Sequence, residues 1–243
     1  ALQVEPMYEQ AIISRAKLLL NEKQYDKSLS DFNRFIDLNK KNSSAYHGRG
    51  KIYAFQGKHE NAIENLTTAY NLDHNNLAAL IDRANSYHSL KNLEMSERDY
   101  SEAIRCNSSI GSLYYNRAVI HLARKEEDKA VGDLEKCLEL SPNNEQAANL
   151  LSSLYLTKKK YPEAERLLTE MLDKCTDEIN LIGIRYNLAT AKKYNSHFES
   201  AIEDYSKVIQ QPPNHLHSYL GRAASYMQLR EYSEALKDYT KSL

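Results

Sequence analysis

Apolar residues recur along the chain at spacings of three, four and seven positions, which is the pattern of amphipathic α-helices. Short segments of turn-forming residues separate the apolar stretches, as at 73–76, 141–144 and 211–214. The chain has only 7 glycines and 5 prolines, which suits long helices joined by short turns. The pattern therefore predicts an all-α protein.

The helical pattern has a fixed period, which two series of small residues reveal. The first series has steps of 34 residues, with a single step of 37 after Ser152: Ala16, Gly50, Ala84, Ala118, Ser152, Ala189 and Ala223. The second series follows it by 12 positions with the same irregular step: Ser28, Ala62, Ser96, Ala130, Ala164, Ala201 and Ala235. A period of this length predicts stacked helical hairpins, in which small residues let paired helices approach closely.

This period divides the chain into seven repeats within a single domain, 1–243, and predicts about 14 helices. The repeats run 9–42, 43–76, 77–110, 111–144, 145–178, 182–215 and 216–243. The last repeat stops at Leu243, inside its predicted second helix. We therefore expect a piece of a longer protein, or a chain without its usual cap. An exposed last repeat also leaves self-association open as a hypothesis.

Bulky and small residues also recur at fixed positions counted from the start of each repeat. The second repeat has Tyr46, Gly50, Tyr53, Ala62, Leu66 and Ala69 at these positions, and the seventh has Tyr219, Ala223, Tyr226, Ala235 and Tyr239. On these residues the chain resembles the tetratricopeptide repeat family over about residues 9–243. The resemblance implies a right-handed superhelical solenoid of stacked antiparallel hairpins. It also implies that the first helices line a concave groove that binds extended or helical peptides.

Charge and cysteine content narrow the function further. With Lys+Arg 32 against Asp+Glu 33, the formal charge is −1, so the chain lacks the basic character that drives non-specific nucleic-acid binding. No apolar run approaches the roughly 20 residues that span a bilayer, so we expect no membrane insertion. Cys106, Cys137 and Cys175 form neither a disulfide framework nor a zinc pattern, which favours a cytoplasmic location. We expect the cysteines to be buried as small apolar residues.

A series of arginines at repeat position 7 allows two interpretations. The arginines are Arg15, Arg49, Arg83, Arg117 and Arg222, and position 23 of the same repeats holds Asp31, Asn65, Asp99, Asp133 and Asp238. The fifth repeat loses both partners, with Leu151 and Leu167, whereas the sixth breaks the pattern with Leu188 and Asp204. A ladder that binds phosphate or carboxylate groups is one interpretation. The paired occurrence favours a structural link between the two helices of each hairpin.

Most of the 18 tyrosines also fall at framework positions, where we expect them to pack in the core. These tyrosines are Tyr25, Tyr46, Tyr53, Tyr87, Tyr100, Tyr114, Tyr155, Tyr161, Tyr205, Tyr219, Tyr226, Tyr232 and Tyr239. Tyr115, Tyr186 and Tyr194 instead fall where the resemblance places ligand-facing residues. Aromatic anchors are enriched at binding hot spots, so these three are candidates for contact with a partner.

The resemblance places the groove residues at repeat positions 2, 5, 9, 12 and 13 of the first helices. The candidate binding residues are His47, Lys51, Phe55, Asn85, His88, Tyr115, Asn149, Tyr186, Lys193 and Tyr194. Asparagine and histidine in this set are suited to hydrogen-bonding a peptide backbone. The open alternative is that some of these residues pack against the next repeat and never touch a ligand.

Chaperone adaptors of this family hold a carboxylate with a clamp of two asparagines and three cations. The best register here reads Ile81, Asn85, Asn116, Gln146 and Leu150, which has the asparagines and none of the cations. Because charge-assisted hydrogen bonds hold such a carboxylate, we do not expect binding of this kind. The sequence also lacks a Gly-rich phosphate loop, a supported Ser–His–Asp arrangement and metal spacing among its eight histidines.

We therefore expect no enzyme, no catalytic residue, no metal and no cofactor. The working hypothesis is a non-catalytic scaffold or adaptor that binds a partner peptide or helix in its groove. Two alternatives stay open. The chain is either the interaction arm of a larger multidomain protein, or a co-chaperone adaptor without the usual carboxylate clamp.

Overall fold

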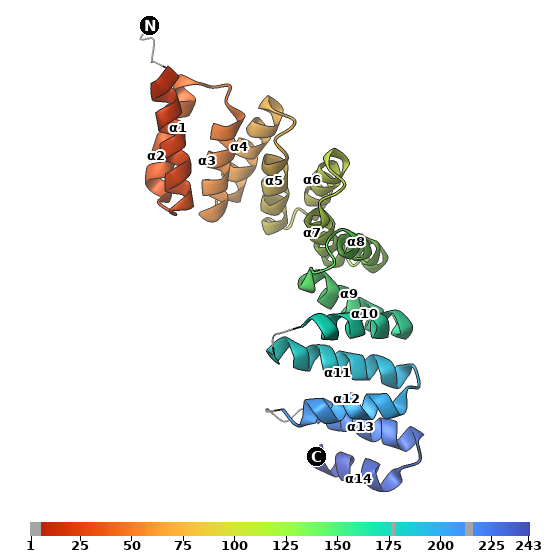
Figure 1. The fold of residues 1–243 in the computed structure, drawn as a ribbon. Helices are drawn as coiled ribbons and strands as arrows, with labels where there is room; N and C mark the ends of the chain where they lie inside the picture. The colour runs from red at the N-terminus through yellow and green to blue at the C-terminus, as the bar shows by residue number, and fades with distance from the viewer. Residues whose placement is uncertain (1–5, 176–177, 212–215) are drawn as a thin grey trace. The chain divides into compact units, whose positions relative to one another are not determined.

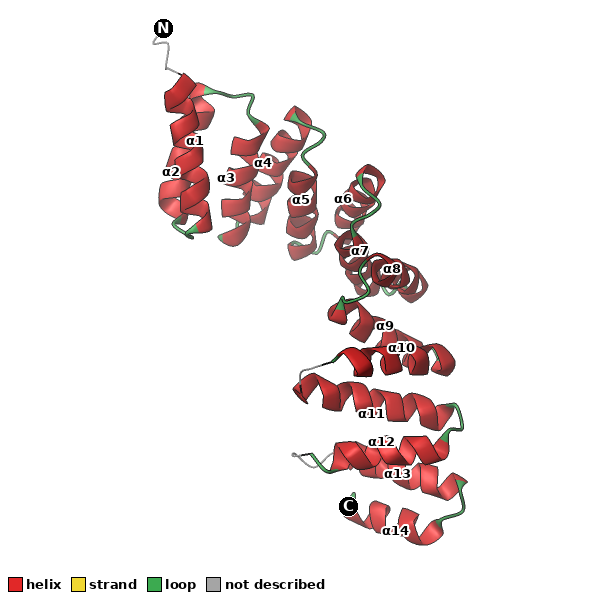
Figure 2. Cartoon of the chain, viewed as in Figure 1, coloured by secondary structure: helices red, strands yellow, loops and turns green. Residues whose placement is uncertain are grey.

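The computed structural model describes residues 6–175, 178–211 and 216–243. All regular secondary structure in these residues is α-helical (Figure 2). Fourteen helices follow one another in this part of the chain (Figure 1): α1 (Pro6–Asn21), α2 (Tyr25–Leu38), α3 (Ser43–Phe55), α4 (His59–Leu72), α5 (Leu77–Ser89), α6 (Leu93–Cys106), α7 (Gly111–Ala123), α8 (Glu127–Leu140), α9 (Glu145–Thr157), α10 (Tyr161–Lys174), α11 (Glu178–Tyr194), α12 (Phe198–Ile209), α13 (Leu216–Gln228) and α14 (Tyr232–Lys241). The predicted all-α fold with about 14 helices is confirmed.

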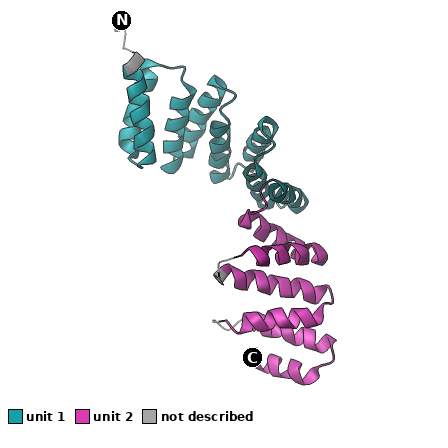
Figure 3. Cartoon of the chain, in the orientation of Figure 1, with its two compact units in different colours: residues 1–140 teal, residues 141–243 magenta. Residues whose placement is uncertain are grey.

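Contacts between Cα atoms divide the chain into two compact units, Ala1–Leu140 and Ser141–Leu243 (Figure 3). Unit 1 contains the hairpins α1–α2, α3–α4, α5–α6 and α7–α8, and unit 2 contains α9–α10, α11–α12 and α13–α14. Within each unit every hairpin packs against the next, so that α4 contacts α5 and α12 contacts α13. The predicted stacking of hairpins is thus confirmed inside each unit. The prediction of one domain over 1–243 stays a prediction.

The two series of small residues lie where the helices of a hairpin meet. The hydroxyl of Ser28 donates to the carbonyl oxygen of Ala16 at 2.7 Å, and that of Ser96 donates to the carbonyl oxygen of Ala84 at 2.9 Å. These four residues are fully buried. The second series therefore packs directly on the first, as predicted, and the serines satisfy their buried hydroxyls at the contact.

The bulky residue at repeat position 24 is buried in every repeat except the last. Six of these residues are at most 2% exposed: Phe32, Leu66, Tyr100, Leu134, Leu168 and Tyr205. The seventh, Tyr239 on α14, is 36% exposed. Burial of a large apolar side chain removes much surface from water, so these positions contribute to the stability of the fold.

Asparagine caps three of the first helices. The side-chain oxygens of Asn42, Asn76 and Asn144 accept from the backbone N–H groups of Ala45, Ala79 and Ala147, each at 3.0 Å. Such N-caps satisfy N–H groups that the helix itself leaves unpaired. The turns predicted at 73–76 and 141–144 are confirmed. The turn predicted at 211–214 lies, from residue 212, outside the described residues.

The irregular step in the repeat lengthens a helix. Helices α3, α5, α7, α9 and α13 have 13 residues each, whereas α11 has 17. The additional residues, 178–181, form an extra turn at the N-terminal end of α11. Across the helices of the described residues, none has the length and apolar character needed to cross a membrane.

Candidate functional site

The arginine series is a set of structural links. In unit 1, Arg83 donates from Nε and Nη2 to the two carboxylate oxygens of Asp99, each at 2.7 Å. Its Nη1 donates to the hydroxyl of Thr67 on the preceding hairpin at 3.1 Å. The Arg83 and Asp99 side chains are only 13% and 4% exposed. This arrangement joins both helices of one hairpin to the hairpin before it.

The same three-way link recurs in other repeats. Arg117 binds Asp133 and the hydroxyl of Ser101, and Arg222 binds Asp238 and the hydroxyl of Ser206; Arg49 binds Asn65 and Asn33. The hydrogen bonds that Arg222 donates to Asp238 raise the pKa of Arg222 above its ordinary value. Because these guanidinium groups are already engaged, the structural interpretation of the series is confirmed and the ligand-binding ladder is wrong.

The sixth repeat shows how an aspartate keeps its partners without the arginine. Leu188 stands where five of the other repeats have arginine, and it is buried. Asp204 instead accepts from Arg185 Nη1 at 3.1 Å and from Lys192 Nζ at 2.7 Å. Two cations from other positions on α11 thus replace the missing one. Sequence reasoning missed this pair because it compared equivalent positions only.

Part of the predicted binding set lies on the first helices of unit 1: His47, Lys51 and Phe55 on α3, Asn85 and His88 on α5, and Tyr115 on α7. We call these six residues the first-helix surface of unit 1. Nε2 of His47 lies 2.7 Å from Oδ2 of Asp82 on the next first helix. The side chain of His47 is therefore held across two repeats.

Asn85 and Phe55 are also held by framework residues. The buried hydroxyl of Tyr100 donates to the side-chain oxygen of Asn85, which leaves the amide N–H groups of Asn85 for other partners. The ring of Phe55 stacks on Tyr25 of the preceding repeat, with centroids 5.6 Å apart and planes at 23°. Phe55 is nevertheless 60% exposed. This surface therefore combines an exposed aromatic ring with oriented polar groups.

The remaining candidates lie in unit 2: Asn149 on α9, and Tyr186, Lys193 and Tyr194 on α11. We call these four residues the first-helix surface of unit 2. Tyr194 stacks on Tyr161 of the preceding repeat, with centroids 4.6 Å apart and planes at 13°. Nζ of Lys193 lies 4.4 Å from the centre of the Tyr194 ring, within the range of a cation–π contact. Tyr194 is 54% exposed.

Tyr186 differs from Tyr194 because it is half-buried against the core. Its ring meets that of Tyr205 edge-on, with centroids 6.0 Å apart. The hydroxyl of Tyr205 is 3.0 Å from that of Thr190, and burial raises the pKa of Tyr205 to about 12. Tyr186 thus has a packing role beside any contact with a partner.

The two stacked pairs occupy equivalent repeat positions. Phe55 and Tyr194 are at position 13, and Tyr25 and Tyr161 are at position 17 of the repeat before. Sequence reasoning assigned Tyr25 and Tyr161 to the core and missed that each supports an exposed ring. The core assignment is wrong for Tyr232 and Tyr239 on α14, which are 58% and 36% exposed. No following hairpin in the described chain covers them.

The cysteines also depart in part from expectation. Cys137 is buried, as predicted, whereas Cys106 at the end of α6 is exposed and Cys175 is half-buried. Cys106 is the last residue of α6. The prediction of burial is therefore wrong for Cys106.

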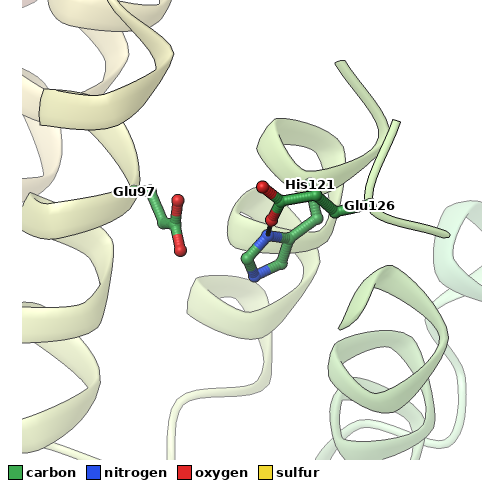
Figure 4. Close-up of side chains that lie close together, drawn as sticks. All are labelled: Glu97, His121 and Glu126. Atoms are coloured by element: carbon green, nitrogen blue, oxygen red, sulfur yellow. Dashed lines mark hydrogen bonds and ion pairs between the residues drawn. The ribbon is translucent and has the colours of Figure 1, made fainter. Parts of the chain in front are cut away.

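One cluster has the composition of a metal site. Glu97, His121 and Glu126 offer ligand atoms that all lie within 4.8 Å of one another (Figure 4). Nδ1 of His121 lies 3.1 Å from Glu126, and the two rest on one hairpin while Glu97 comes from α6. Arg124 already bridges the two carboxylates, at 2.6 Å from Glu97 and 3.0 Å from Glu126. The guanidinium group of Arg124 therefore already balances part of the charge of both carboxylates.

An equivalent contact in unit 2 supports a structural role for this cluster. Glu165, at the repeat position of Glu97, accepts from the amide of Asn195 at 2.6 Å and lies 3.1 Å from Nδ1 of His197. Asn195 stands at the repeat position of Arg124. Both groups tie one hairpin to the next through a glutamate. We therefore assign the Glu97 cluster to packing between repeats.

The hollows of the surface coincide only partly with the predicted site. In unit 1 a hollow of about 830 Å³ is lined by residues of α4, α5 and α6 that include Tyr70, Arg83 and Arg98, and it includes none of the candidate residues. In unit 2 a pocket of about 300 Å³ is lined in part by Asn149. Asn149 is thus a candidate residue that lines a pocket.

Comparison with known proteins supports the division of the chain into helical repeats. Three family models described as tetratricopeptide repeat match residues 43–76, 111–144 and 186–243, together just over half of the chain. Human RNA polymerase II-associated protein 3 is 28% identical over 171 residues, which are 66% of this chain and 26% of that protein. The DnaJ homolog subfamily C member 3 homolog of Dictyostelium discoideum is 26% identical over 208 residues, 77% of this chain and 40% of that protein.

A solved structure shows the same fold. The tetratricopeptide repeat protein from Parabacteroides merdae has a TM-score of 0.63 at 18% identity, over 96% of this chain and 91% of that one. The chain spans less than half the length of the two curated relatives named above. The period, the helical hairpins and the matched repeats lead to one conclusion. The chain belongs to the tetratricopeptide repeat family.

Proposed function

We propose that the chain is a non-catalytic adaptor that binds a partner peptide or helix on its first-helix surfaces. The observation that carries this proposal is the exposure of Phe55 and Tyr194, which are 60% and 54% exposed although each is stacked on a tyrosine. An exposed aromatic ring held in one orientation loses little side-chain entropy when a partner covers it. The two rings are therefore suited to anchor a partner.

The polar candidates add directional contacts to these anchors. The amide of Asn85 is oriented by Tyr100, and His47 is oriented by Asp82. Groups that are already oriented form hydrogen bonds with a peptide at a smaller entropic penalty than free side chains do. Lys51, His88 and Tyr115 stand on the same surface of unit 1 and complete its polar and aromatic composition.

A non-catalytic role accounts for the charged residues of the interior. The buried carboxylates of Asp99, Asp133 and Asp238 are each held by an arginine in a structural link. The formal charge of −1 favours protein over nucleic acid as the partner. We place the protein in the cytoplasm because its few scattered cysteines suit a reducing compartment. Self-association through Tyr232 and Leu236, both exposed on α14, stays a prediction.

The test compares partner capture by matched variants. We expect Tyr194→Ala and Phe55→Ala to retain the helical circular dichroism spectrum and to lose proteins that the unchanged chain captures from a cell extract. Leu18→Ala is the control, because it removes another exposed apolar side chain that lies outside the candidate set. Equal capture by all three variants and the unchanged chain would refute the proposed surfaces.

Two narrower versions of the adaptor follow from the relatives. The chain covers 26% of human RNA polymerase II-associated protein 3, which fits an interaction arm of a larger protein. The relative named as a DnaJ homolog fits a co-chaperone adaptor. The sequence of the full-length gene tests the first version. A full-length gene that encodes no further domain would contradict it. A peptide that ends in a chaperone carboxylate tail tests the second version. We expect no binding through the carboxylate, because the clamp cations are missing from the best register, and binding that depends on the carboxylate would contradict this version.

A further inference from the structure

The extra turn of α11 borders a pocket of about 300 Å³ in unit 2. Its lining comes from the segment before α9, the first turn of α9, the end of α10 and the start of α11. Ala148, Met171 and Ile184 contribute an apolar part of this lining, and each is at most 9% exposed. The pocket therefore offers an apolar site that no side chain of the described residues fills.

Three carboxamides surround the apolar part: Asn143, Asn149 and Asn180. All three are exposed, and their side chains make no hydrogen bond within the part of the chain that the structure describes. A carboxamide offers both donors and an acceptor, as a peptide backbone does. Asn180 lies on the extra turn itself, so the irregular repeat step supplies one of these groups.

The charges of the lining distinguish its two ends. Glu145 lies in the first turn of α9, where the helix dipole favours an acid. Lys174 lies in the last turn of α10, is exposed, and forms no ion pair with the described residues. Lys174 is therefore the group of this pocket that is available to a negatively charged ligand.

We propose that this pocket binds an extended peptide segment of a partner protein, with an aliphatic side chain inserted between Ala148, Met171 and Ile184. The acidic residue that follows this side chain in the peptide pairs with Lys174, and the asparagines hydrogen-bond the peptide backbone. A pocket of 300 Å³ is at the small end of ligand sites, which suits a few residues and excludes a whole helix. The inference deepens the proposed function and rests on it for the class of partner.

The test uses Cys175, which lines the pocket and is half-buried. The probes are N-acetyl-Leu-Asp amide, N-acetyl-Ala-Asp amide and N-acetyl-Leu-Lys amide. Alkylation of Cys175 by iodoacetamide is followed by mass spectrometry, with the exposed Cys106 as an internal control. We expect saturating Leu-Asp peptide to slow alkylation of Cys175 about fivefold or more and to leave Cys106 unchanged, because reactivity requires access to the thiol. The other two peptides should protect much less.

Variants separate the parts of the proposal. Lys174→Glu should reverse the preference between the Leu-Asp and Leu-Lys peptides, and Ala148→Leu should remove protection by filling the apolar part. Equal protection by the three peptides, or none at millimolar concentrations, would overturn the proposal. Tyr194→Ala should leave the protection unchanged. Unchanged partner capture by Tyr194→Ala, together with protection of Cys175 by the Leu-Asp peptide, would contradict the first-helix surface alone. Reduced capture by Tyr194→Ala, without such protection in the unchanged chain, would contradict the pocket alone.

Discussion

The ring of Tyr205 packs against Gly221 at a distance that leaves no room for a side chain: a Cβ atom on residue 221 would stand 2.4 Å from Cζ of the tyrosine. Phe32 and Gly48 have the same relationship, with a corresponding distance of 2.2 Å. In both cases the ring belongs to one repeat and the glycine to the next. The glycine therefore makes space for the aromatic residue that joins the two hairpins.

Alanine at these glycines is the first prediction. Gly221→Ala and Gly48→Ala should lower the free energy of unfolding by about 1–3 kcal/mol, because the added methyl group displaces a buried ring. Urea denaturation measures the effect. Gly132→Ala on α8 is the control: apart from its chain neighbours and the backbone of its own helix, no heavy atom lies within 4 Å of its Cβ position. There the better helix propensity of alanine should stabilise by about 0.5–1 kcal/mol. Stabilisation at Gly221 as well would show that the ring moves without penalty.

A second prediction concerns the turns between the helices of each hairpin. At repeat position 15, Lys91 has φ 61°, and Gly57 of the repeat before has φ 74°. A left-handed conformation disfavours residues that have a Cβ atom. We expect Lys91→Gly to stabilise by about 0.5–1 kcal/mol and Gly57→Ala to destabilise by about 1 kcal/mol.

The control for this prediction is Lys91→Ala, which removes the lysine side chain and keeps the Cβ atom in the left-handed conformation. Thermal and urea unfolding should place Lys91→Ala close to the unchanged chain. If Lys91→Ala and Lys91→Gly stabilise equally, the lysine side chain causes the destabilisation, and the backbone conformation does not.

The repeat could be predicted from sequence because its phase depends on single residues at fixed spacing. Small residues such as Ala16 and Ser28 must stand where two helices touch, and that requirement recurs in every hairpin. The Arg83–Asp99 link was predictable for the same reason, since both partners keep their positions.

Other features could not be predicted because they depend on how far side chains reach. Asp204 is bound by Arg185 and Lys192, which occupy positions that are bulky or aromatic in most other repeats. Whether Phe55 covers Tyr25 or points into solvent likewise depends on the packing of two hairpins. The residues of the candidate binding surface could therefore be predicted from their repeat positions, whereas the contacts among them are visible only in the structure.

The third prediction concerns the link between Arg83 and Asp99. Asp99→Leu alone should destabilise by about 3–5 kcal/mol, because it leaves a half-buried guanidinium group without its carboxylate. The double variant Arg83→Leu/Asp99→Leu should recover most of this loss, since the fifth repeat already has Leu151 and Leu167 at these positions. Urea unfolding of Asp99→Leu, of Arg83→Leu and of the double variant gives the coupling energy between the two side chains. Additive effects would show that the two side chains stabilise the hairpin independently.

The fourth prediction is a pH dependence at Glu126. A hydrogen bond from Lys129, one from His121 and the charge of Arg124 lower the pKa of Glu126 to about 2. In the unfolded chain the pKa of a glutamate is about 4.3. The folded state therefore binds fewer protons than the unfolded state between these values. The stabilisation by Glu126 is fully present above about pH 5 and is lost as the pH falls toward 2.

We accordingly expect Glu126→Gln to destabilise the chain at pH 6 and to differ less and less from the unchanged chain at pH 4.5 and pH 3, in urea unfolding at each pH. Glu170→Gln on α10 is the control for the substitution itself, because this acid is exposed and forms no ion pair among the described residues. A difference for Glu126→Gln that stays constant with pH would contradict the prediction. Protonation of the carboxylate must weaken its ion pairs with Arg124 and Lys129. A difference that does not change with pH would therefore show that the charge of Glu126 does not contribute to stability.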